Sequence, residues 1–307
     1  MVRLIASIVG AAFVLVLGIA LFGSIQGVRN DPVAPTAESV AHKHPKELEL
    51  ASNGVFGKFD RRQLQRGFQV YKEVCSACHS LRLVSFRDLT KIGYTDPEVK
   101  AIAIQWVIEQ PSINPETGEP ATRKNIPSDH FPSPFANEIA ARAANNNALP
   151  PDLSLITKAR EDGTAYVHSL LTGYTTQPAA LLKEFPDIKT PEGLHYNPYF
   201  ANLNIAMPPP LTSDGQVTYA DGTKPTVDQM STDVSAFLTW TAEPKLENRH
   251  RYGLTVVIFL IFATILGYLS YRNIWAEAKR KVAPVGPLDP ANMARREDAK
   301  DQSGIAG

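Results

Sequence analysis

Cysteine is scarce in this chain: of 307 residues only two are cysteine, Cys75 and Cys78. A structural zinc site takes four ligands, so the lack of a second cysteine pair argues against a zinc fold. Phosphate-binding glycine motifs and internal repeats are also missing, and few segments alternate apolar and polar residues. These absences predict a mainly α-helical domain with long loops.

The two cysteines stand in the run Cys75-Ser76-Ala77-Cys78-His79, which reads C-x-x-C-H. Thiols at this spacing on a helix project one turn apart, so both can form thioethers with the vinyl groups of one haem. The histidine follows directly and is placed to ligate the iron. A thioredoxin-like redox motif would follow a strand in a β-α-β pattern, which this region lacks. The run therefore predicts one covalently attached haem c, which leaves no thiol for a structural disulfide.

A haem iron with one histidine ligand needs either a sixth ligand or an open face. Of the four methionines, Met1 and Met293 lie in the end segments, and Met230 fits the apolar stripe of a predicted helix. Met207 remains, and the three prolines that follow it stiffen the backbone. Met207 is therefore the favoured sixth ligand, which would suit electron transfer because it closes the iron to substrates. Three histidines stay open as alternatives: His130, His168 and His195.

Two long apolar runs lie near the ends of the chain. Residues 253–271 include 19 positions without a charge, enough to cross a hydrocarbon core of ~30 Å. A basic cluster follows this run, which favours a cytoplasmic C-terminus and places the preceding domain outside. Residues 4–23 are also apolar, longer than the usual core of a secretory signal but adequate for a span. We expect either a cleaved signal or a retained anchor, and both would export the middle of the chain.

The formal net charge is zero, but the charges are unevenly placed. Residues 31–248 carry 20 Lys and Arg against 26 Asp and Glu, an acidic excess of six. An acidic domain attracts a basic partner and speeds its arrival, although a small negative balance can also serve solubility alone.

Helix signals stand on both sides of a loop-rich centre. Asp60 can cap a helix whose apolar positions follow at steps of four and three residues: Leu64, Phe68, Tyr71, Cys75 and Cys78. This spacing places both cysteines on the buried stripe of one amphipathic helix. Thr226 and Gln229 form a T-x-x-Q capping box for a second helix that runs to about residue 242. Weaker helical patterns cover residues 135–146 and 162–171.

Six segments stand in order along the chain: RGFQVYKEVCSACHSL, AARAANNNALPPDLSLITKAR, YVHSLLTGY, YNPYF, IAMPPPL and DVSAFLTWTAEP. Together with the apolar run that follows, they resemble cytochrome c1, the haem subunit of the ubiquinol–cytochrome c reductase (cytochrome bc1) complex. The resemblance covers about residues 56–281. It implies a mainly α, class-I cytochrome c-like domain with long loop insertions, thioethers at Cys75 and Cys78, and His79 and Met207 as axial ligands.

The same resemblance implies two further contacts to the haem. Arg142 would meet a propionate, which suits the bidentate geometry of a guanidinium. The turn at Pro150 and Pro151 would lie over His79, where a carbonyl could accept the second imidazole N–H and raise the basicity of the ring.

The implied function is that of an electron carrier with no catalytic residues of its own. It would pass electrons from the Rieske iron–sulfur protein to a soluble or tethered cytochrome c, within a dimeric complex that contains cytochrome b. Since haem attachment of this type takes place outside the bacterial cytoplasmic membrane, the haem domain would be periplasmic. No nucleic-acid partner is expected.

The expected organisation is a signal or N-terminal anchor at 1–26, a linker at 27–55, the haem domain at 56–248, a transmembrane anchor at 249–275 and a cytoplasmic tail at 276–307.

Two alternative functions share some of these features. A membrane-anchored cytochrome that serves a terminal oxidase or another reductase would have the C-x-x-C-H run but not the ordered segments. A haem peroxidase would need an open iron, which Met207 would close. The chain also departs from some bacterial relatives, which carry an extra cysteine pair in the loop before the methionine, so we expect this loop to be held by packing alone.

Overall fold

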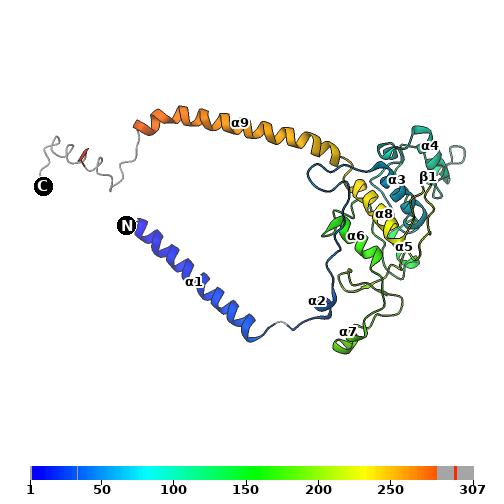
Figure 1. Ribbon diagram of the computed structural model, residues 1–307, viewed down its shortest axis with the longest axis horizontal. Coiled ribbons are helices and arrows are strands. Elements are labelled where there is room, and N and C mark those ends of the chain that lie inside the picture. Colours follow the sequence, from blue (N-terminus) through cyan, green and yellow to red (C-terminus); the bar gives the residue numbers. More distant parts are fainter. Residues whose placement is uncertain (1, 33, 282–293, 296–307) are drawn as a thin grey trace. The chain divides into compact units, whose positions relative to one another are not determined.

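The computed structural model describes residues 2–32, 34–281 and 294–295, and helices dominate it (Figure 1). The α-helices are α1 (Val2–Asn30), α2 (Ala37–Ala41), α3 (Arg61–Val70), α4 (Asp96–Gln105), α5 (Glu138–Ala144), α6 (Gly163–Thr172), α7 (Ala179–Glu184), α8 (Val227–Ala242) and α9 (Leu246–Lys281). Shorter helical turns are η1 (Tyr71–Cys75), η2 (Phe86–Ile92) and η3 (Pro186–Ile188). Two small antiparallel pairs complete the fold: β1 (Gln110–Ile113) with β2 (Pro120–Arg123), and β3 (His195–Tyr196) with β4 (Asn204–Ile205). The mainly α prediction is confirmed.

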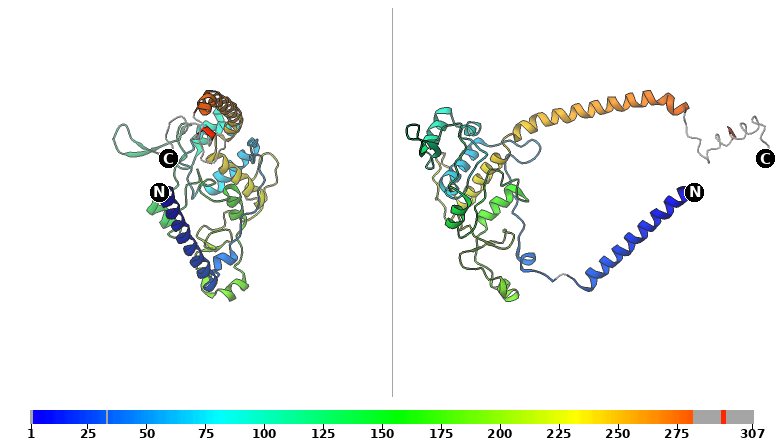
Figure 2. Two further views of the ribbon diagram at one scale, coloured as in Figure 1. Left: turned by 90° about the vertical axis from the view of Figure 1, so that its left-hand side faces the viewer. Right: turned by 180° about the vertical axis from the view of Figure 1, so that it is seen from behind.

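Helices α3 and α8 form the centre of the domain and pack side by side (Figures 1 and 2). The predicted cap of α3 is present, because the Asp60 carboxylate accepts from the backbone N–H of Arg62 and of Gln63. Close approach of the two helices depends on Gly67: a Cβ there would lie 2.0 Å from the carbonyl oxygen of Asp233 on α8. Only a residue without a side chain therefore fits this crossing.

Aromatic side chains fill the space around this crossing. Phe68 of α3 packs against Phe237 of α8 with ring centroids 5.7 Å apart, and also against Trp106 and Phe131. Tyr71 joins the same group. All five side chains are buried. Since large aromatic rings dominate core energetics, this cluster fixes the start of η1, the segment that leads into the two cysteines.

An ion pair also joins the two central helices. The Asp233 side chain of α8 is fully buried and receives two hydrogen bonds from the Arg66 guanidinium, at 2.8 and 3.1 Å. The predicted capping box of α8 is only half formed. The Thr226 hydroxyl accepts from the Gln229 backbone N–H as expected, but the Gln229 side chain donates to Asp233 instead of returning to the cap. A buried carboxylate outcompetes the exposed cap for this amide.

The segment predicted to be a linker contains structure. Helix α2 begins at a complete capping box, in which Thr36 and Ser39 each bond the backbone of the other. After it, the Lys43 N–H donates to the Pro198 carbonyl and the Lys46 N–H to the Ser169 hydroxyl. These contacts tie the segment to loops far away in sequence, which a composition-based reading cannot reveal.

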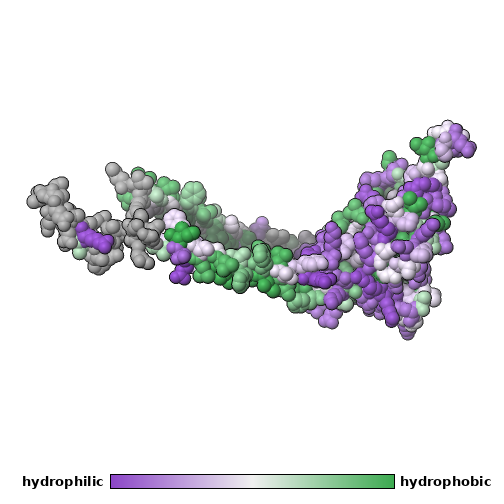
Figure 3. Space-filling model, turned by 90° about the horizontal axis from the view of Figure 1, so that it is seen from above, coloured by the Kyte–Doolittle hydropathy of each residue, from purple (hydrophilic) through white to green (hydrophobic). Residues whose placement is uncertain are grey.

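Within the described part of the chain, two helices are long and apolar enough to cross a membrane, over Leu4–Asn30 in α1 and Leu246–Ala276 in α9. Their described side chains are almost all exposed, and Figure 3 shows hydrophobic surface along the long helices and a mainly hydrophilic surface on the domain. Contacts divide the chain into two compact units, Met1–Pro244 and Lys245–Gly307. Apart from residues 294–295, the tail expected beyond residue 281 lies outside the described residues.

Candidate haem site

The C-x-x-C-H run forms a tight turn at the end of the first central helix. Helix α3 ends at Val70, and η1 widens by one residue, since the Ser76 N–H donates to the Tyr71 carbonyl at 2.8 Å. The chain then folds over, with the N–H groups of Cys78 and His79 both donating to the Cys75 carbonyl. Such single widened turns are frequent at functional sites.

One prediction about the cysteines is wrong. Leu64, Phe68 and Tyr71 are buried as expected, but Cys75 is half-buried and Cys78 is exposed. The α-helix ends before the cysteines, and the widened turn rotates Cys78 off the buried stripe. Both thiols are free, so each is available for a covalent bond.

The thiols differ in their surroundings. Burial raises the pKa of the Cys75 thiol to about 12, and the nearby Cys78 adds to this effect. Cys75 is therefore a neutral S–H group at physiological pH. Two free thiols and an imidazole in one five-residue turn are the donor set that a haem with two vinyl groups and one iron requires, so the residues fit the predicted group.

The His79 imidazole is held by one of its two nitrogens. Nδ1 lies 2.8 Å from the carbonyl oxygen of Pro151, which fixes this nitrogen as the N–H donor and leaves Nε2 with a free lone pair. The backbone carbonyl of His79 in turn accepts from the Tyr71 hydroxyl at 3.0 Å. Burial lowers the pKa of His79, while the Pro151 carbonyl and Asp152 oppose this shift. The ring is therefore neutral at physiological pH, which is the form that binds a metal.

Asp152 joins the Pro151 turn to the C-x-x-C-H turn. Its carboxylate accepts from the Ser80 hydroxyl and the Arg82 N–H, both at 2.8 Å, and from the Ser154 N–H at 3.0 Å. Burial alone would raise the pKa of Asp152, but these hydrogen bonds lower it below its ordinary value. Sequence reasoning missed this residue, although an acidic side chain directly after Pro150-Pro151 was a visible signal.

Met207 lies on a separate loop and is half-buried. Strand β4 pairs with β3 two residues before it, and the Met207 carbonyl accepts from the Tyr174 hydroxyl at 3.1 Å. Burial raises the pKa of Tyr174, so its hydroxyl keeps the proton that it donates. Sequence reasoning missed Tyr174, because nothing local links it to a residue 33 positions away.

The loop before Met207 is not held by packing alone, contrary to the prediction. Gln177 bridges it, with its amide N–H donating to the Ile188 carbonyl and its amide oxygen accepting from the N–H and hydroxyl of Thr190. A small apolar cluster supports these bonds: Leu181, Tyr196 and Leu203, with Ala41, Phe185 and Ile188 against them. Side-chain hydrogen bonds thus do part of the work that a disulfide would do.

Arg142 is exposed on α5, and its guanidinium donates to the Asn147 carbonyl at 3.1 Å. Asn146 and Asn147 adopt left-handed backbone conformations, with φ of 50° and 63°, which turn the chain sharply after the helix. This contact turns the guanidinium to its own loop, and the role of Arg142 toward a propionate stays a prediction.

The three alternative histidines differ in their environments. His168 is buried between α6 and α8, with Nε2 3.1 Å from an Asp228 carboxylate oxygen. Burial lowers the pKa of His168, and the nearby carboxylate opposes this. His130 lies in an isolated bridge with Ser85, and the His195 ring packs beside Tyr174.

A helical domain that presents two free thiols and a neutral histidine in one C-x-x-C-H turn has the arrangement of a haem-binding cytochrome. Comparison with known proteins identifies which one. The family model described as the Cytochrome C1 family matches residues 50–278, and the chain belongs to this family.

Individual relatives agree. The chain is 43% identical over 235 residues to cytochrome c1 of Rhodospirillum rubrum, covering 74% of this chain and 85% of the relative. It is 47% identical over 229 residues to "Cytochrome c1-2, heme protein, mitochondrial" of Solanum tuberosum, covering 74% and 84%. A third relative, "Cytochrome b/c1" of Bradyrhizobium diazoefficiens, is 43% identical over 288 residues. That alignment covers 89% of this chain, which spans only 40% of the length of that relative.

Proposed function

We propose that this chain binds one haem c covalently and serves as the electron-transfer subunit of a ubiquinol–cytochrome c reductase. The observation that carries the proposal is the C-x-x-C-H turn with His79 Nδ1 bonded to the Pro151 carbonyl. This bond directs the free Nε2 lone pair to a metal and increases its basicity. Family membership supports the haem, since relatives are named as haem proteins.

In this proposal Cys75 and Cys78 would hold the haem through two thioether bonds, each made by adding a thiol S–H across a vinyl group, which needs no oxidant. His79 and Met207 would ligate the iron, and the haem would supply reversible one-electron exchange. A thioether ligand favours the reduced iron and raises the reduction potential. Arg142 would pair with a propionate.

The relatives support the proposed partners, and the apolar helices support the proposed location. One of them, in Candida albicans, is named "Cytochrome b-c1 complex catalytic subunit, mitochondrial". We infer that this chain likewise works beside cytochrome b, accepts electrons from a Rieske protein and passes them to a cytochrome c, in a dimeric complex. The apolar helices α1 and α9 support membrane attachment. The haem domain then faces the periplasm of a bacterial cytoplasmic membrane.

The first experiment is purification of the tagged chain in mild detergent, followed by a reduced-minus-oxidised haem spectrum and identification of the proteins that accompany it. We expect c-type and b-type haem in fixed ratio, a Rieske protein, and quinol-driven reduction of added cytochrome c. Haem that remains attached to the chain after denaturation would establish covalent binding. Persistent c-type haem beside a terminal oxidase, after gentle extraction, would contradict the reductase assignment and leave the ligand assignments to separate tests.

A further inference from the structure

The loop that carries Met207 lacks backbone hydrogen-bond donors at three successive positions. Pro208, Pro209 and Pro210 have no N–H group, so none of them can donate to a carbonyl within the loop. Two side chains supply donors from outside the triplet. The Tyr174 hydroxyl donates to the Met207 carbonyl at 3.1 Å, and the Gln216 amide donates to the Pro210 carbonyl at 2.8 Å.

We infer that Tyr174 is a positioning residue for Met207: its hydroxyl holds the methionine backbone and so determines how firmly the thioether stays on the iron. This inference rests on the proposed role of Met207 as axial ligand. Tyr174 acts through the backbone and does not itself meet the metal in this assignment.

Tyr174 is suited to this task because its own backbone is fixed. It follows Gly173, where a Cβ would lie 2.4 Å from the Tyr199 ring and 2.9 Å from the Asn197 amide oxygen. Asn197 is fully buried, and its amide nitrogen donates to the Leu170 carbonyl at 2.8 Å. The end of α6 is thus clamped against the 196–199 loop, and Tyr174 projects from this clamp.

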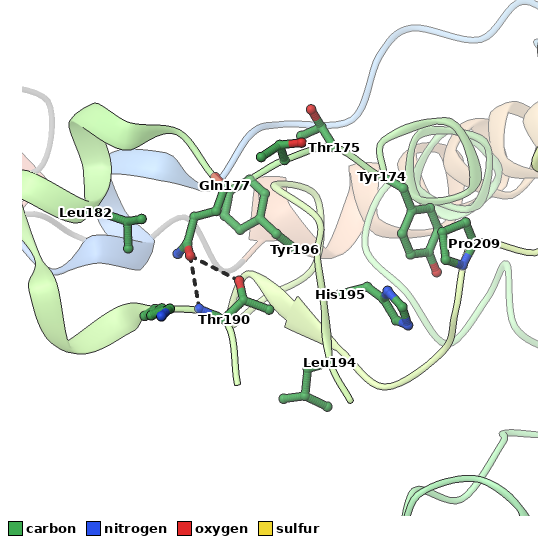
Figure 4. Close-up of a pocket in the computed structure, with 11 residues that line it drawn as sticks. Tyr174, Thr175, Gln177, Leu182, Thr190, Leu194, His195, Tyr196 and Pro209 are labelled. Atoms are coloured by element: carbon green, nitrogen blue, oxygen red, sulfur yellow. Dashed lines mark hydrogen bonds between the residues drawn. The ribbon is translucent and has the colours of Figure 1, made fainter. Parts of the chain in front are cut away.

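The ring of Tyr174 is also supported from the side. Tyr174, His195 and Pro209 lie at one end of an open groove of about 570 Å³ (Figure 4). The Tyr174 and His195 rings meet edge to face, with centroids 6.5 Å apart. His195 pairs with Ile205 across β3 and β4, so the same short ladder places both the ring and the start of the methionine loop. The Tyr174 ring and the strand that leads to Met207 are therefore positioned by the same two-stranded pair.

The test is Tyr174→Phe in the full-length, haem-loaded chain, since this change removes the hydroxyl and keeps the ring. Carbon monoxide binds reduced haem only where the thioether has left the iron. Losing one neutral hydrogen bond should raise the carbon monoxide affinity about 2- to 10-fold. We also expect a lower reduction potential, a weaker methionine-to-iron charge-transfer band in the oxidised protein, and unchanged haem content.

Two matched variants make the result specific. Tyr199→Phe removes the hydroxyl of another buried tyrosine but keeps the ring that lies against Gly173, so it should leave carbon monoxide affinity unchanged. Met207→Leu should open the iron fully. An unaltered Tyr174→Phe protein beside a responsive Met207→Leu protein overturns this inference alone. An unresponsive Met207→Leu protein overturns the ligand assignment in the proposed function, and the inference with it.

A second measurement decides the matter if Tyr174→Phe does not load haem. Hydrogen exchange in the full chain should be faster in Tyr174→Phe than in Tyr199→Phe at the amides of residues 206, 207 and 211, on either side of the prolines. Equal exchange rates at these amides in the two variants would show that Tyr174 does not hold the loop.

Discussion

At the scale of single residues, the two thiols of one turn have different chemistry. Cys75 is half-buried with a pKa raised to about 12, whereas Cys78 is exposed. The thiolate is the nucleophile in alkylation. Burial therefore slows the reaction of Cys75 in two ways, because it limits access of the reagent and keeps the thiol protonated. This difference is a property of the polypeptide itself.

We therefore predict that Cys78 is alkylated at least about ten times faster than Cys75 in the haem-free chain at about pH 8. Mass spectrometry of the peptides after timed exposure to iodoacetamide measures both rates. In denaturant the two thiols should react at similar rates, which serves as the control. Equal rates in the folded chain would show that the turn does not have the described form.

A second residue-scale prediction concerns Asp152, which joins the Pro151 turn to the C-x-x-C-H turn. Asp152→Asn should lower the free energy of unfolding by about 1–3 kcal/mol at pH 7, because it weakens several charge-assisted hydrogen bonds. The folded pKa of Asp152 lies below its ordinary value of 3.8. Its contribution is therefore present above this value and is lost as the pH falls through the folded pKa.

Thermal unfolding of the full chain in detergent, followed by near-ultraviolet circular dichroism, checks this dependence. The gap between wild type and Asp152→Asn should shrink from pH 7 to about pH 3. Asp162→Asn, at an exposed turn position, is the matched control and should show little change at either pH. A gap that is constant with pH would mean that the carboxylate charge is not what stabilises the turn.

At the scale of helices, the crossing of α3 and α8 sets the position of everything that follows it in the chain. The closest approach is at Gly67, where a methyl group would overlap the Asp233 carbonyl and the Phe237 Cβ. Gly67→Ala should cost about 3 kcal/mol or more, at the upper end of the range for overpacked cores. Arg62→Ala, exposed on the same helix, should change stability by less than about 0.5 kcal/mol. Comparable melting temperatures for the two variants would contradict the described crossing.

The ion pair across the same crossing makes a separate prediction. Arg66→Met leaves the buried Asp233 carboxylate without its cation, which should cost about 3–5 kcal/mol. The double variant Arg66→Met/Asp233→Leu should recover most of this loss, since no charge then remains buried. Lys91→Met removes the exposed partner of Asp88 and should cost under about 1 kcal/mol. The single variant Asp233→Leu completes the comparison. If the stability losses of Arg66→Met and Asp233→Leu simply add in the double variant, Arg66 and Asp233 are not energetically coupled.

At the scale of the whole molecule, features set by neighbouring residues could be predicted from the sequence. Features set by contacts between distant residues could not. The C-x-x-C-H run, the Asp60 cap and the apolar stripes of α3 and α8 are local patterns, and the structure contains them. The contacts of Asp152 with Ser80, 72 residues apart, and of Tyr174 with Met207 have no local signature. The prediction of a complete capping box for α8 was wrong for the same reason. The Gln229 side-chain amide donates to Asp233 instead of to the backbone of the cap residue.

The charge of the domain gives the last prediction, which concerns its encounter with another protein. Residues 31–248 carry an acidic excess of six, so a basic cytochrome c should be drawn to the domain through solution. The second-order rate of electron transfer from the reduced chain to a basic cytochrome c should fall about tenfold or more between about 0.01 M and 0.3 M salt, because the screening length shortens from ~30 Å to under ~10 Å. Stopped-flow mixing measures the rate. An acidic cytochrome of similar size should respond in the opposite direction, since screening removes a repulsion. A rate with the basic cytochrome that does not change with salt would mean that the acidic excess serves solubility and does not guide docking.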